Sequence, residues 1–121
     1  MENKEIYKEL ARSLSAYNNC IKTNDEECQD KYEEKINELL NELPHGSGLD
    51  GNWELDYAKS SNTQLVLHME YHCMNENGYY DGWVHFTLKV KASLQFDIDL
   101  SIIGNFEKYQ DVKEYLYDIL G

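Results

Sequence analysis

The feature that most constrains the fold is the segment from residue 65 to residue 90, whose alternating apolar pattern predicts a β-hairpin. Asn77-Gly78 supplies the two residues with positive φ that a two-residue type I′ turn requires. A turn at this position pairs Glu76 with Tyr79 and thereby fixes every other facing pair of the two strands. Because side chains alternate across a strand, this register sorts them into two faces.

One predicted face is apolar and is expected to join the core. Its facing pairs are Leu65 and Val90, Leu67 and Leu88, Met69 and Phe86, and Tyr71 and Val84. The opposite face is polar and aromatic. Its facing pairs are His68 and Thr87, Glu70 and His85, and His72 and Trp83. This second face holds three of the four histidines, so we expect function there, although the pattern identifies no reaction.

Two amphipathic helices are predicted before the hairpin. Apolar residues at helical spacing indicate a first helix over residues 4–18. A second helix is predicted over residues 25–42, with Asn24 as its cap, Glu27 completing a capping box and Pro44 stopping it. The short linker between the helices favours an antiparallel helical hairpin.

Further strands and a last helix complete the expected fold. Trp53, Leu55 and Tyr57 alternate with acids as a first strand, and a fourth strand over residues 94–100 follows a turn near residues 91–93. Gly104-Asn105 ends the sheet, and residues 106–120 form the terminal helix. The chain is therefore predicted to be one α+β domain over residues 1–121, in which a helical hairpin and a C-terminal helix pack on one face of a four-stranded antiparallel meander.

Charge and length exclude several classes of protein. The net charge is −12 and the pI is near 4.6, which argues against direct binding to nucleic acid and leaves a basic protein as a suitable partner. No apolar run reaches the roughly 20 residues that cross a bilayer, and the first residues do not resemble a signal peptide. We expect a cytoplasmic protein without a membrane partner, and its oligomeric state is undetermined.

The three cysteines are expected to be reduced thiols, because they are odd in number and lack the spacing of a zinc motif. Cys20 and Cys28 flank the turn between the helices and could approach each other. Small buried apolar roles on the helix faces are the simpler interpretation.

The second helix concentrates the negative charge. Residues 25–42 hold eight acids and two lysines, which gives −6 of the total −12. The first acids complement the positive end of the helix, whereas Glu33, Glu34 and Glu38 lie beyond that end and are candidate partner-binding residues.

The histidine face also permits a metal hypothesis. His68, Glu70 and His72 alternate on one strand, and His85 is expected across from Glu70. Because His68 and His72 are roughly 13 Å apart by strand rise, a zinc centre would use Glu70, His85 and only one of them, with His68 as the candidate. Such a centre would support a metal-dependent hydrolase, which is the alternative function. The favoured interpretation is a polar, partner-facing surface without cofactor.

Nucleophilic and phosphate-binding motifs are weak. Ser47 lacks the surroundings of a nucleophile elbow, and Cys73 is predicted on the core face. The glycine-rich segment 45–51 lacks the spacing and the lysine of a P-loop. No catalytic residue is therefore assigned, and whether the chain is an enzyme is left open.

The hairpin tip over residues 71–83 is rich in aromatic residues, which are enriched at binding surfaces. His72, Tyr79 and Trp83 are the candidate contacts. Together with the segment 43–51, this tip resembles small uncharacterised proteins encoded by bacteriophages and other mobile elements. The resemblance carries no established activity, but it implies a host-modulating or anti-defence inhibitor that mimics nucleic acid. We therefore expect a small acidic module that occupies the surface of a protein partner, such as a basic nucleic-acid-binding protein.

Overall fold

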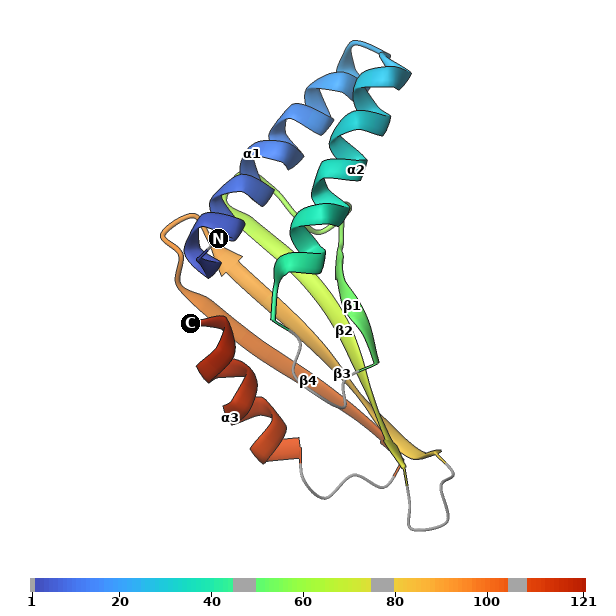
Figure 1. Ribbon diagram of the computed structural model, residues 1–121, viewed down its shortest axis with the longest axis vertical. Coiled ribbons are helices and arrows are strands. Elements are labelled where there is room, and N and C mark those ends of the chain that lie inside the picture. Colours follow the sequence, from blue (N-terminus) through green and yellow to red (C-terminus); the bar gives the residue numbers. More distant parts are fainter. Residues whose placement is uncertain (1, 45–49, 75–79, 105–108) are drawn as a thin grey trace.

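The computed structural model describes residues 2–44, 50–74, 80–104 and 109–121 of the chain, and only the backbone is described for residues 50–52, 71–74, 80–83, 102–104 and 109–112. Three helices and four strands follow one another along it (Figure 1). They are α1 (Asn3–Lys22), α2 (Glu26–Glu42), β1 (Asp50–Leu55), β2 (Gln64–Met74), β3 (Tyr80–Lys91), β4 (Phe96–Gly104) and α3 (Tyr109–Leu120).

The strands form one antiparallel sheet in the order β1-β2-β3-β4, which is the meander that the sequence predicts. The two long helices α1 and α2 lie side by side as an antiparallel hairpin, and α3 lies near β4 on the same side of the sheet (Figure 1). The predicted α+β fold, with a helical hairpin and a C-terminal helix on a four-stranded sheet, is confirmed.

The pairing of β2 with β3 follows the predicted register over most of its length. Facing pairs run without interruption from Leu65 with Val90 to Cys73 with Gly82. The register then shifts, so that Met74 pairs with Tyr80. The uninterrupted register would pair Met74 with Asp81 instead. A bulge of this kind adds one residue to one strand. The predicted pair of Glu76 and Tyr79 lies outside the described residues.

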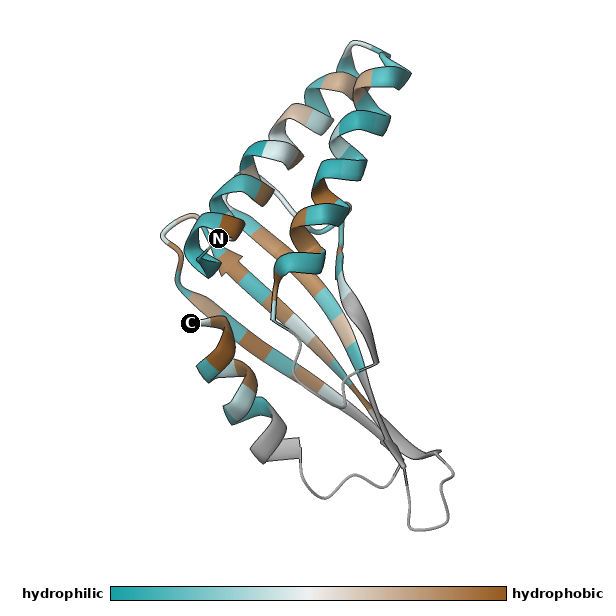
Figure 2. Ribbon diagram, viewed as in Figure 1, coloured by the Kyte–Doolittle hydropathy of each residue, from teal (hydrophilic) through white to brown (hydrophobic). Residues whose placement is uncertain are grey.

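The core lies between the apolar face of the sheet and the helices (Figure 2). The predicted core face of the hairpin is confirmed where side chains are described. Its buried members are Leu65, Leu67, Met69, Val84, Phe86, Leu88 and Val90. The helices contribute Ile6, Leu10 and Leu14 from α1, Ile36, Leu39 and Leu40 from α2, and Leu116 and Leu120 from α3.

Helix α2 begins one residue later than predicted. Asp25 is the N-cap, and its carboxylate accepts a hydrogen bond from the backbone N–H of Cys28 at 3.1 Å. The predicted cap, Asn24, instead adopts a left-handed conformation with φ 57°. Asparagine tolerates this conformation better than most residues do, so Asn24 completes the turn between the helices rather than the cap.

Two of the predicted strand boundaries are wrong. Leu94 has φ 69° and lies in the turn between β3 and β4, so β4 begins at Phe96 rather than at Leu94. Strand β1 ends at Leu55, and Tyr57 follows it in an exposed turn rather than in the core. In both cases the apolar alternation extends beyond the end of the strand, so the pattern alone overestimates the length of the strand.

The helical hairpin carries a disulfide between Cys20 and Cys28, whose Cα atoms are 5.5 Å apart. The prediction of reduced thiols is therefore wrong for this pair. Disulfides persist in oxidising compartments and are rare in the cytosol, so this bond is at odds with the cytoplasmic location that the sequence suggests. It joins the end of α1 to the first turn of α2.

The two ends of the described chain are tied together by hydrogen bonds. The buried Tyr7 hydroxyl donates to the carbonyl of Leu120 at 3.0 Å, and Asn3 Nδ2 donates to the carbonyl of Ile119 at 2.6 Å. The Tyr117 hydroxyl accepts from the backbone N–H of Ile98 at 2.9 Å. Burial raises the pKa of Tyr7, which keeps its hydroxyl protonated as a donor. These contacts dock α3 against α1 and β4.

The buried position of Phe86 gives a test of the register. Phe86→Ala removes a fully buried ring and should lower the free energy of unfolding by about 3 to 5 kcal/mol. Lys89→Ala is the control, because Lys89 is exposed on the same strand and should cost less than about 0.5 kcal/mol. Urea unfolding of the two variants measures the difference. Equal stabilities would contradict the assignment of the core face.

Candidate functional site

The open face of the sheet carries a row of polar side chains on β2 and β3. His68 faces Thr87 across the strand pair, and Glu70 faces His85, as the sequence predicts. Glu70 is exposed, whereas His68, His85 and Thr87 are partly buried. The predicted polar face is therefore confirmed for these four residues.

The side chains on this face form a continuous row that runs carboxylate, imidazole, imidazole, carboxylate. Asp56 Oδ2 lies 2.8 Å from His68 Nε2, and His68 Nδ1 lies 3.0 Å from His85 Nε2. His85 Nδ1 lies 3.7 Å from Glu70 Oε1. We refer to Asp56, His68, His85 and Glu70 as the histidine row.

Which nitrogen donates in the row depends on the tautomer of each ring. A neutral His68 that donates its Nε2–H to Asp56 has an acceptor lone pair at Nδ1. The hydrogen bond between the rings then requires His85 to donate its Nε2–H to that lone pair. The Thr87 hydroxyl, 3.3 Å from the same Nδ1, is a second possible donor. The row is thus a hydrogen-bonded network that holds both rings in defined orientations.

Asp56 is the member of the row that the sequence did not identify. It is the first residue after β1, and its other carboxylate oxygen accepts the backbone N–H of Lys59 at 3.0 Å. The hydrogen bond to His68 lowers the pKa of Asp56, and the bond from Lys59 lowers it further. The sequence shows that Asp56 and Tyr57 fall on opposite sides of the chain. It does not show that Asp56 meets His68 of the neighbouring strand β2.

The metal hypothesis receives no support from this geometry. In the described ranges, no group of three or more His, Cys, Asp or Glu is arranged to hold a metal ion. The facing nitrogens of His68 and His85 are committed to each other, and the side chain of His72 lies outside the described part. The assignment of Glu70, His85 and His68 as metal ligands therefore stays a prediction.

The second candidate surface is the outer face of α2. All seven of its acids are exposed, namely Glu26, Glu27, Asp30, Glu33, Glu34, Glu38 and Glu42. A shallow depression on this face is lined by Asp30, Glu33, Glu34, Asn37, Glu38 and Asn41. The three predicted contact residues Glu33, Glu34 and Glu38 thus lie together. We call the outer face of α2, with its seven exposed acids, the acidic face.

The aromatic contacts predicted at the hairpin tip cannot be placed. Tyr79 lies outside the described residues, and only the backbones of His72 and Trp83 are described, as a facing pair on β2 and β3. The structure instead reveals an aromatic pair beside the helices. The rings of Tyr17 and Tyr57 have centroids 5.0 Å apart and planes tilted by 49°. The alternation of Trp53, Leu55 and Tyr57 predicts a strand that includes Tyr57, so it gives no signal for this pair.

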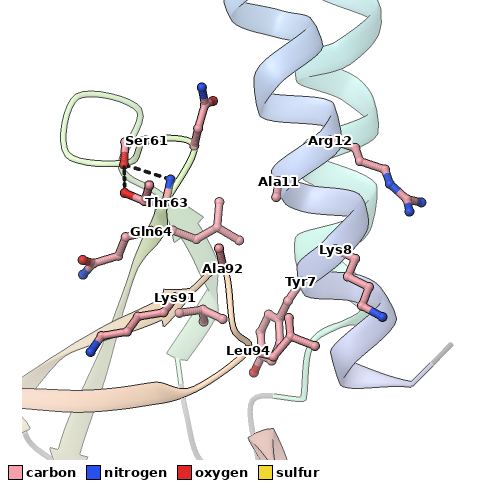
Figure 3. Close-up of a pocket in the computed structure, with 13 residues that line it drawn as sticks. Tyr7, Lys8, Ala11, Arg12, Ser61, Thr63, Gln64, Lys91, Ala92 and Leu94 are labelled. Atoms are coloured by element: carbon pink, nitrogen blue, oxygen red, sulfur yellow. Dashed lines mark hydrogen bonds between the residues drawn. The ribbon is translucent and has the colours of Figure 1, made fainter.

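A small pocket of about 170 Å³ lies between α1 and the adjoining ends of β2 and β3. Its wall includes Tyr7, Ala11 and Leu94, and one side is closed by Ser61 and Thr63, whose hydroxyls are 3.0 Å apart. Figure 3 shows the charged ends of Lys8, Arg12 and Lys91 directed away from the space between the helix and Ser61. These three charged groups therefore do not converge on the pocket.

No protein-family model, curated protein or solved structure matches this chain. Within the described part of the chain, no helix combines the length and apolar character needed to span a membrane.

The lowered pKa of Asp56 predicts a pH-dependent contribution to stability. The folded state binds fewer protons at Asp56 than the unfolded state does, so this contribution is present above the ordinary pKa of 3.8 and is lost as pH falls through the lower folded value. Asp56→Asn, which resembles the protonated side chain, should lower the melting temperature at pH 6, and this difference should shrink as the pH falls below the ordinary pKa of 3.8. A difference that does not change with pH would contradict this role.

Zinc binding separates the two interpretations of the histidine row. If the row is only a hydrogen-bonded network, equimolar zinc should leave the melting temperature unchanged, since any ligand of the folded state at 100-fold its Kd adds about 2.7 kcal/mol. Thermal melts with zinc and with a chelator measure this. Stabilisation that disappears in both Glu70→Gln and His85→Ala would support the metal-dependent hydrolase instead.

Proposed function

We propose that this chain is a small acidic binding module that occupies the surface of a basic protein partner. The observation that carries the proposal is the acidic face of α2, where seven exposed acids outnumber the two lysines of the helix. A charged, exposed face of one sign steers an oppositely charged partner and raises the rate of encounter.

The charges in the middle of α2 have no structural explanation. Glu26 and Glu27 lie in the first turn, where acids stabilise the positive end of the helix. Glu33, Glu34 and Glu38 lie beyond that turn, and their side chains make no ion pair or hydrogen bond with any residue that the structure describes. The ion pairs of this region involve other residues, such as Lys35 with Glu9 at 3.8 Å. These three acids are therefore available to a partner.

The spacing of the acids supports a partner that ordinarily binds nucleic acid. At a rise of 1.5 Å per residue, α2 is about 26 Å long and carries one acid per about 3.6 Å of its axis. One strand of DNA carries a phosphate about every 3.4 Å. The acidic face can thus offer a basic groove a similar linear density of negative charge, although its two lysines reduce the net value. A host-modulating or anti-defence inhibitor of the phage type would act in this way.

The disulfide bears on where the module can act. A cytoplasmic site of action, which the sequence favours, requires that binding survive reduction of the bond between Cys20 and Cys28. The burial of Ile36, Leu39 and Leu40 anchors α2 independently of that bond. The acidic face should therefore persist in the reduced protein.

Charge reversal tests the proposal against a matched control. The variant Glu33→Lys, Glu34→Lys, Glu38→Lys should slow association with the partner captured from the source cell by about tenfold or more at low salt, and it should flatten the salt dependence. The control reverses the exposed acids Asp97, Glu114 and Asp118, which changes the net charge equally but leaves α2 intact. Association rates measured by surface plasmon resonance compare the two variants.

The comparison between the two variants decides whether location or total charge matters. Equal loss of association in both variants would mean that only net charge matters, and the acidic face would then be an ordinary solvated surface. Affinity that is independent of ionic strength would also end the nucleic-acid-mimicry proposal, because mimicry of phosphates requires salt-dependent binding.

A further inference from the structure

The outer end of the helical hairpin is held by the disulfide between Cys20 and Cys28. The bond joins the last turn of α1 to the first turn of α2 across a sequence separation of 8 residues. Figure 1 shows that this end of the hairpin extends beyond the sheet. The fully buried residues of α2 are Ile36, Leu39 and Leu40, which all lie in its second half. Core packing therefore anchors the inner half of α2, and the disulfide ties its outer half to α1.

The two cysteines differ in exposure. Cys20 is buried, with 2% of its surface exposed, whereas Cys28 is only partly buried. Thiol–disulfide exchange begins when a thiolate attacks a sulfur atom that it can reach. An incoming thiolate therefore bonds to Cys28 Sγ, and Cys20 Sγ leaves as a thiolate.

A second molecule of the thiol completes the reduction. It attacks the incoming sulfur of the mixed disulfide and releases Cys28 Sγ as a thiolate. The two small thiols lose two protons and two electrons and become one disulfide. The two cysteines gain those protons and electrons and become thiols.

Carboxylates flank the more accessible cysteine. Asp25 Oδ1 accepts the backbone N–H of Cys28 at 3.1 Å, and Glu26 and Glu27 precede Cys28 in the first turn of α2. These three acids and Asp30 are all exposed. An attacking thiolate therefore approaches Cys28 past four carboxylates that are close to it in the chain.

Positive charges near the bond are fewer. The N-terminus of α2 carries about half an elementary positive charge. Lys22, in the last turn of α1, and Lys31 of α2 add two more. The four carboxylates therefore leave a net negative charge at this end of the hairpin.

We propose that the disulfide between Cys20 and Cys28 is a redox-sensitive clamp whose opening depends on the charge of the attacking thiol. A thiolate that also carries an ammonium group has no net charge, whereas a thiolate with a second anionic group carries two negative charges. The negative field at Cys28 repels the second reagent and not the first. Cationic thiols therefore open the clamp, whereas anionic thiols such as glutathione leave it closed for longer.

Two thiols of nearly equal size test the inference on the full-length, disulfide-bonded protein. They are 2-aminoethanethiol, which is cationic, and 2-mercaptoethanesulfonate, which is anionic. Reduction is followed by alkylating the released thiols and measuring the masses of the peptides that contain Cys20 and Cys28. The rate ratio is the second-order rate constant of the cationic thiol divided by that of the anionic thiol, each expressed per thiolate. At low salt it should exceed its value in about 1 M salt, where the Debye length is about 3 Å, by about threefold or more.

Charge-neutralising variants decide which acids matter. The test variant combines three substitutions beside Cys28, namely Glu26→Gln, Glu27→Gln and Asp30→Asn. The control variant neutralises three exposed acids of β4 and α3, namely Asp97→Asn, Glu114→Gln and Asp118→Asn. The rate ratio at low salt should fall about threefold or more in the test variant and change less than about 1.5-fold in the control. Comparing ratios cancels the intrinsic reactivity of the thiols, and thermal melts confirm that each variant keeps the fold.

Hydrogen exchange tests whether the bond holds the end of the hairpin. Reduction should speed amide exchange over residues 18–28, because the disulfide ties this end together. Exchange over residues 36–40 should stay slow, because the core holds that part of α2. Identical exchange before and after reduction would overturn the clamp.

The rate measurements can reject the inference independently of the proposed function. A rate ratio that does not respond to salt, or that falls equally in the test and control variants, would exclude control by the acids beside Cys28. A bond that neither thiol reduces in the folded protein would exclude a redox-sensitive clamp. A ratio that falls only in the test variant, together with faster exchange over residues 18–28 after reduction, would establish it. Because no partner protein enters these measurements, the proposed function can fail while the clamp stands.

Discussion

The pairing of β2 with β3 is the constraint on which the other features depend. In its register, Leu67, Phe86 and Leu88 all point toward the helices and are fully buried. A slip by one residue would turn these side chains to solvent and bring the polar face against the core. The same register that builds the core therefore also brings His68 and His85 together on the open face.

The turn after β1 connects the open face of the sheet to helix α1. Asp56 binds His68 on the open face of the sheet, whereas the next residue, Tyr57, contacts Tyr17 of α1. The hydrogen bond from the Lys59 N–H to Asp56 shapes this turn. The histidine row and the contact between Tyr17 and Tyr57 thus depend on one short segment.

The helical hairpin separates its buried apolar residues from its exposed charged residues. The inner residues of α2 are buried in the core, while its outer residues carry the acids. Acids that repel one another on one helix reduce its stability, so α2 needs the anchoring that its buried residues supply in the core. This arrangement holds a charged surface in a defined position without using those charges to maintain the fold.

The sequence by itself determined the element order, the register of the central hairpin, the polar face with His68 and His85, and the acidic face of α2. These features follow from periodicity and local turn chemistry, which act over a few residues. Only the tertiary structure decided that Asp56 meets His68, that Tyr57 leaves the sheet to meet Tyr17, and that Cys20 bonds to Cys28. Such contacts depend on where separate elements come to lie in space, and no local pattern encodes that placement.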